Sequence, residues 1–134
     1  YKMNSLNIKT ILFPSDFTPE AYIIFKSVVE FAKIFNAQIH LLTVNTPHNP
    51  IDKAAIEEKM ELFISYFKLT KNYTKAIFDD VNQELGVLNY CIDNSMDMIA
   101  IGTHGKSVLK KLLKESTSQN LVRDAFRPVL TMKF

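Results

Sequence analysis

The chain has 134 residues, of which 47% are hydrophobic and 22% charged, and its formal net charge is +2. This length predicts a single domain, and the small charge argues against nucleic acid or an acidic membrane surface as a partner. The single cysteine, Cys91, excludes an internal disulfide framework and favours a cytoplasmic location, and no apolar run approaches the ~20 residues of a transmembrane helix.

The first part of the chain alternates between strand and helix patterns. The run Lys9–Pro14 predicts a short strand that proline stops. Thr18 then suits a helix N-cap and Pro19 the first helical position, and apolar residues follow at spacings of three and four up to Phe35. A second strand is expected at Gln38–Val44, before a loop rich in proline and asparagine.

The middle of the chain continues this alternation. Apolar residues at helical spacing predict a helix over Ile51–Leu69, and alternating polar and apolar residues predict an edge strand at Tyr73–Phe78. A third helix is expected at Gln83–Asn94, although Gly86 lowers its helix propensity. The nearly continuous apolar run Asp97–Gly102 is typical of a central parallel strand.

The last elements complete the pattern of a doubly wound α/β fold. A helix is expected at Ser116–Ala125 and a final strand at Pro128–Met132. Strict alternation of strands and helices predicts a five-stranded parallel sheet with helices on both faces. Ligands of such sheets bind at the carboxyl ends of the strands, which are here followed by Pro14–Thr18, Val44–Asn45 and Gly102–Gly105.

A glycine-containing turn after the fourth strand is the strongest functional signal. Ile101–Gly105 reads Ile-Gly-Thr-His-Gly, and nine residues later the chain continues with Glu115, Ser116 and Thr117. A strand, a glycine turn and a helix N-terminus favour anion binding, because free backbone N–H groups and the helix dipole point to one place.

These segments together resemble the universal stress protein family over essentially the whole chain. The resemblance rests on Lys9–Asp16, Asp97–Gly105 and Pro128–Leu130. It implies one domain over residues 1–134, with residues 1–8 as an N-terminal extension or a tag remnant. It also implies the strand order 3-2-1-4-5, as in the adenine-nucleotide alpha hydrolases, and a role in the stress response.

The resemblance also implies a nucleotide site. By this similarity Asp16 lies near the adenine and the ribose, Val44 meets the adenine ring, and Gly102 and Gly105 let the loop approach the ribose and phosphates. Each residue also has a purely structural interpretation. Asp16 suits the turn into the first helix, Val44 suits the core, and the two glycines suit an ordinary turn.

Phosphate binding is implied for Ser116 and Thr117, which equally suit the N-cap of the following helix. Glu115 stands where nucleotide-binding members of the family carry a third glycine. A carboxylate about 4 Å from a phosphate charge costs up to ~4 kcal/mol at an effective dielectric constant of 20. We therefore expect weak binding of ATP or AMP, and no metal of the protein's own.

Two other motifs carry less weight. Ala100–Ser107 is a near match to a P-loop, but Ala100 replaces the first glycine and is expected inside the strand. A receiver domain needs paired acidic residues after the first strand, where Asp16 stands alone. His104 has no second ligand at metal-binding spacing, so we interpret it as an exposed loop residue.

The sequence leaves two classes of function open. The first is a stress-response regulatory domain that holds an adenine nucleotide weakly, and the second is a nucleotide-free module for dimerisation or for binding an unknown protein. Val129, Leu130 and Met132 on an exposed sheet edge predict a homodimer through the last strand. No nucleophile–base pair is recognisable, so we expect no enzyme, with at most slow, incidental ATP hydrolysis.

Overall fold

The structure is a computed structural model that describes residues 8–101 and 130–133. In these residues the chain forms strands and helices in the order β1 (Thr10–Pro14), α1 (Pro19–Phe35), β2 (Gln38–Asn45), α2 (Lys53–Tyr66), β3 (Tyr73–Asp79), α3 (Gln83–Asn94), β4 (Met98–Ile101) and β5 (Leu130–Lys133). The helix predicted at Ser116–Ala125 lies outside the described residues.

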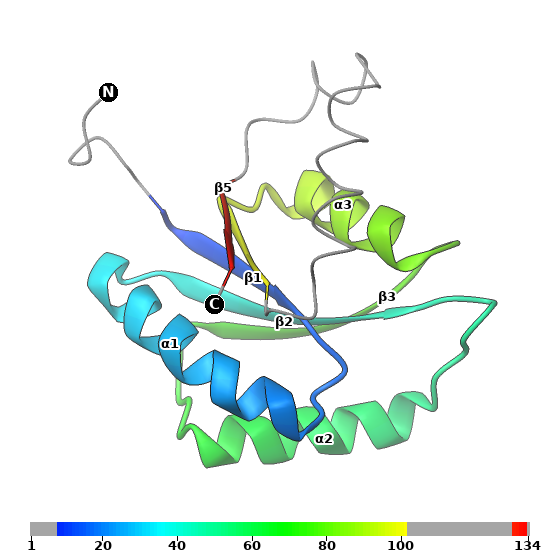
Figure 1. The fold of residues 1–134 in the computed structure, drawn as a ribbon, viewed down its shortest axis with the longest axis horizontal. Helices are drawn as coiled ribbons and strands as arrows, with labels where there is room; N and C mark the ends of the chain where they lie inside the picture. Colours follow the sequence, from blue (N-terminus) through cyan, green and yellow to red (C-terminus); the bar gives the residue numbers. More distant parts are fainter. Residues whose placement is uncertain (1–7, 102–129, 134) are drawn as a thin grey trace.

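The strands form one parallel sheet in the order β3-β2-β1-β4-β5, which confirms the predicted fold class and strand order. Phe13 of β1 lies opposite Leu41 of β2, and Leu12 lies opposite Ile99 of β4. Helices α1 and α2 cover one face of the sheet and α3 covers the other (Figure 1). The sheet therefore has two separate apolar layers.

The central strand β1 contributes to both layers. Ile11 and Phe13 pack towards α1 and α2, whereas Leu12 packs towards α3. All three side chains are at most 2% exposed. This alternation explains the continuous apolar run of the strand, because a strand covered on both faces has no solvent side.

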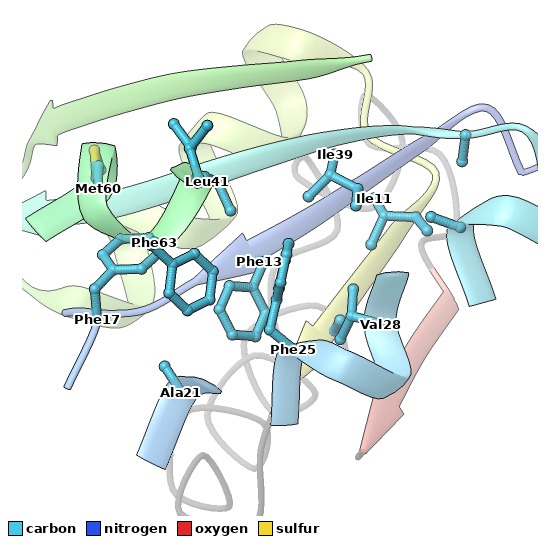
Figure 2. Close-up of a cluster of buried hydrophobic side chains, with 14 of the residues drawn as sticks. Ile11, Phe13, Phe17, Ala21, Phe25, Val28, Ile39, Leu41, Met60 and Phe63 are labelled. Atoms are coloured by element: carbon cyan, nitrogen blue, oxygen red, sulfur yellow. The ribbon is translucent and has the colours of Figure 1, made fainter. Parts of the chain in front are cut away.

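An aromatic cluster fills the layer between the sheet and the first two helices (Figure 2). The ring centroids of Phe13 and Phe25 are 4.9 Å apart, those of Phe25 and Phe63 are 4.7 Å apart, and those of Phe17 and Phe63 are 5.0 Å apart. Such pairs contribute roughly 0.5–1.5 kcal/mol each beyond area burial. The cluster joins β1, the β1–α1 loop, α1 and α2.

Residues at the helix ends explain where the helices begin and end. Thr18 is the N-cap of α1, as predicted, although its side chain makes no capping bond, and Asn36 ends the helix with a left-handed φ of 53°. The helix predicted over Ile51–Leu69 is shorter in the structure. It begins after Asp52, whose carboxylate accepts a hydrogen bond from the backbone N–H of Ala54 at 3.0 Å.

Asp97 joins the first and fourth strands at the amino edge of the sheet. Its Oδ2 accepts hydrogen bonds from the backbone N–H groups of Lys9 at 2.8 Å and Thr10 at 3.1 Å. In return, the backbone N–H of Asp97 donates to the Thr10 hydroxyl at 3.0 Å. These bonds fix the start of β4 beside the start of β1.

A histidine–tyrosine pair connects β2 to α3. Nδ1 of His40 lies 2.8 Å from the hydroxyl oxygen of Tyr90, and the two rings meet edge to face. Burial lowers the pKa of His40 and raises the pKa of Tyr90, because a charged form of either group is poorly solvated there. The folded chain therefore favours the neutral imidazole.

This pair predicts a loss of stability in mild acid. As the pH falls below 6.5, the unfolded chain takes up a proton at His40 before the folded chain does, so the free energy of unfolding decreases until the lowered folded-state pKa is passed. Urea unfolding between pH 7.5 and 5 measures this. His40→Gln should flatten the dependence, and His48→Gln, at an exposed loop position, should keep the wild-type profile. A His40→Gln variant that loses stability as steeply as the wild type would contradict the assignment.

Candidate functional site

A pocket in the described part of the chain lies at the carboxyl ends of β1, β2 and β4. Its volume is about 590 Å³, within the range of small-molecule sites. Asp16, Val44 and Ile101, at or just after the ends of these three strands, all line it. The strand order reverses between β1 and β4, so the pocket occupies the position at which doubly wound sheets bind ligands.

Hydrogen bonds hold the loop after β1 against β2. The backbone N–H of Ser15 donates to the carbonyl of Leu42 at 2.9 Å, and the hydroxyl of Thr43 donates to the carbonyl of Ser15 at 2.6 Å. Phe17 has a left-handed φ of 59°, and its buried ring anchors the other side of the loop. Asp16 lies between these anchors and is exposed at the pocket.

Val44 lines the pocket and also belongs to the core beneath α3, where it is 2% exposed. Gly86 of α3 lies directly against it. A Cβ atom added at Gly86 would lie only 2.8 Å from Cγ2 of Val44 and still closer to Cγ1. A glycine that lowers the helix propensity is thus needed for α3 to approach the sheet.

Several pocket residues could not be identified from the sequence, among them Gln83, Glu20 and Lys59. Gln83 lines the pocket from α3, and its Nε2 donates a hydrogen bond to the carbonyl of Val44 at 3.0 Å. Glu20 and Lys59 are exposed residues that line it from α1 and α2. The three come from different helices and share no motif. For Gln83 and Glu20 the available signal was that the first turn of a helix following a strand lies at the carboxyl edge of the sheet, whereas Lys59 lies in the middle of α2 and carried no such signal.

The loop between β2 and α2 forms a further wall and is held by polar side chains at the ends of β2 and β3. Asn45 accepts a hydrogen bond from the backbone N–H of Ile51 at 2.9 Å and donates one to Asp79 at 3.0 Å. The Asn45 amide and the nearby Lys53 ammonium lower the pKa of the Asp79 carboxyl. Asp79 therefore closes this loop as an ionised carboxylate.

The predicted phosphate-binding residues Gly102, Gly105, Ser116 and Thr117, with Glu115, lie outside the described residues. The strand that leads to them ends at Ile101 and contains Ala100, as predicted, which argues against a P-loop. Within residues 8–101 and 130–133, no group of three or more His, Cys, Asp or Glu side chains could hold a metal ion. The helices described there are too short or too polar to cross a membrane.

Comparisons with known proteins agree on one family. The chain matches the model of the universal stress protein family over residues 7–133. A universal stress protein of Methanocaldococcus jannaschii is 26% identical, over 96% of this chain and 97% of that protein.

Two solved structures share the fold. A universal stress protein in complex with cAMP has a TM-score of 0.63 and 13% identity, over 96% of this chain and 98% of that one. The universal stress protein from Archaeoglobus fulgidus in complex with dAMP has a TM-score of 0.64 and 14% identity, over 94% and 98% of the two chains.

The contact between Val44 and Gly86 predicts that substitutions at these two positions have strongly coupled effects on the free energy of unfolding. Gly86→Ala should lower the free energy of unfolding by about 1–2 kcal/mol, because overpacking costs about 1–3 kcal/mol and the gain in helix propensity offsets up to ~1 kcal/mol. Val44→Ala should lower the free energy of unfolding by at least ~1 kcal/mol less in the Gly86→Ala background than in the wild type, because it removes the clash with the added methyl group. Urea unfolding of the four proteins measures the coupling, and additive effects would show that the helix shifts freely.

Proposed function

Because the chain belongs to the universal stress protein family, we propose that it is a regulatory domain of the stress response whose pocket binds an adenine nucleotide weakly. The observation that carries this proposal is the pocket at the carboxyl ends of β1, β2 and β4. Solved members of the family in complex with cAMP and dAMP support the choice of ligand.

The order of the strands suits the order of groups in a nucleotide. Neighbouring strands lie about 4.8 Å apart, so the ends of β2 and β4 are separated by roughly 10 Å with β1 between them. We assign the base to Val44 at the end of β2, the ribose to Asp16 after β1, and the phosphates to Gly102 and Gly105 after β4.

Phosphate affinity is the weak part of this proposal. Ser116 and Thr117 supply hydroxyl and backbone N–H groups, whereas Glu115 brings a negative charge towards the phosphates. A left-handed backbone at Glu115 would add a cost of ~1–2 kcal/mol for a residue other than glycine. We assign no catalytic residue and infer at most slow, incidental ATP hydrolysis.

The position of β5 supports the competing function, a nucleotide-free interaction module. This strand (Leu130–Lys133) pairs with β4 and ends the strand order of the described sheet. We infer that a homodimer forms by pairing of this edge. The dimer is compatible with either function, so nucleotide binding decides between them.

The first experiment is a calorimetric titration with ATP. Glu115→Gly should bind ATP about tenfold or more tightly than the wild type, because each ~1.4 kcal/mol recovered corresponds to a factor of ten. Glu115→Gln removes the charge and keeps a side chain of the same size. It therefore separates the electrostatic cost of Glu115 to ATP binding from the cost of its backbone conformation. Asp16→Ala should weaken binding in each background. Flat titrations of the wild type and of Glu115→Gly would favour the interaction module.

The second experiment is light scattering at micromolar concentration. We expect the mass of a dimer, since an unpaired parallel edge strand readily adds a further strand. Met132→Lys, which places a charge on this strand, should give the mass of a monomer. A monomeric wild type at this concentration would rule out the edge as a dimer interface.

A further inference from the structure

We propose that Gln83 makes the pocket selective for a 6-aminopurine over a 6-oxopurine, an inference that rests on the proposed nucleotide binding. Gln83 is the first residue of α3 and lines the pocket beside Val44. Its Nε2 donates a hydrogen bond to the Val44 carbonyl at 3.0 Å. The side-chain amide thus lies at the end of β2, where we assign the base.

This hydrogen bond fixes which way the amide faces. A carbonyl oxygen only accepts, so the amide nitrogen must face Val44. A flipped Gln83 would turn Oε1 towards the carbonyl oxygen and leave two acceptors without a donor, which is unfavourable near a buried wall. Val44 is itself held by its packing against Gly86 in the same helix, so neither partner moves freely.

The amide keeps two groups for a ligand, the acceptor Oε1 and the second N–H of Nε2. Adenine presents an amino donor beside a ring-nitrogen acceptor and can pair with both groups. A 6-oxopurine carries an acceptor in place of the amino group, so Oε1 of Gln83 would face another oxygen. The amide could suit this base only by flipping and losing its bond to Val44.

The surrounding wall is suited to a flat base. Leu42, Val87 and Ile101 line the same pocket, and each is at most 4% exposed. Polar side chains such as Asp16, Glu20 and Lys59 also line the pocket, but Gln83 is the one that is hydrogen-bonded to Val44, where we assign the base. A mismatch at this amide leaves its Oε1 facing another acceptor beside these apolar walls, which is unfavourable.

AMP and IMP provide a matched pair for the test, because they share the ribose and phosphate and differ at the purine edge. Titrations followed by ligand NMR should show that the wild type binds AMP about tenfold or more tightly than IMP, as one bidentate base contact allows. Gln83→Met keeps the length of the side chain without its hydrogen bonds and should bring the ratio close to one.

Gln38→Met is the matched control. Gln38 starts β2 at the opposite edge of the sheet, where its Nε2 donates to the hydroxyl of Thr74 at 2.8 Å, so this variant should keep the wild-type ratio. Gln83→Glu tests the same bond without loss of polarity, because an ionised carboxylate has no proton to donate to Val44. It should lose the preference for AMP as well.

The outcomes separate the two proposals. Selection by Gln83 would be overturned if the wild type bound AMP and IMP with equal affinity. It would also be overturned if Gln83→Met or Gln83→Glu folded and kept the wild-type ratio of affinities. Either result would leave the proposed nucleotide pocket unaffected. Absence of binding of both nucleotides to the wild type would overturn the proposed function together with this inference.

Discussion

The burial of β1 on both faces is the constraint from which the rest of the architecture follows. Ile11 and Phe13 face one helical layer and Leu12 faces the other, and the neighbouring strands β2 and β4 also contribute buried side chains to both layers. The chain adds β2 and β3 on one side of β1, and β4 and β5 on the other. The strand order therefore reverses between β1 and β4, and the pocket lies at the carboxyl ends of these strands.

The walls of the pocket belong to the packed core. Hydrogen bonds from Ser15 to Leu42 and from Thr43 to Ser15 hold the loop that carries Asp16, and the ring of Phe17 holds its other side. These contacts are made within the protein itself. A site that is already ordered loses less conformational freedom on binding, and this favours affinity at the end of the pocket where the base is assigned.

The periodicity of apolar residues was sufficient to predict the fold, since Ile11–Phe13 reads as a strand buried on both faces and α1 shows a regular apolar stripe. Interactions between segments distant in sequence could not be predicted in this way. From the sequence, Gly86 only lowers the helix propensity of α3, and its packing against Val44 explains why glycine is needed there. Gln83 looks like an ordinary helix start until the sheet brings the Val44 carbonyl to it. The glycine loop stays a prediction.

The two ends of the pocket depend on different forces, and this allows affinity and selectivity to vary independently. At the end of β2, the fixed amide of Gln83 and apolar walls respond to the pattern of donors and acceptors on a base. In the proposed site, Glu115 follows β4 in the chain and would act through its charge, an effect that does not depend on the base attached to the phosphate. Because the proposal assigns Gln83 to the base and Glu115 to the phosphates, we expect substitutions at the two positions to have additive effects on binding. The acidic residue can therefore weaken every nucleotide alike while the amide still discriminates between bases.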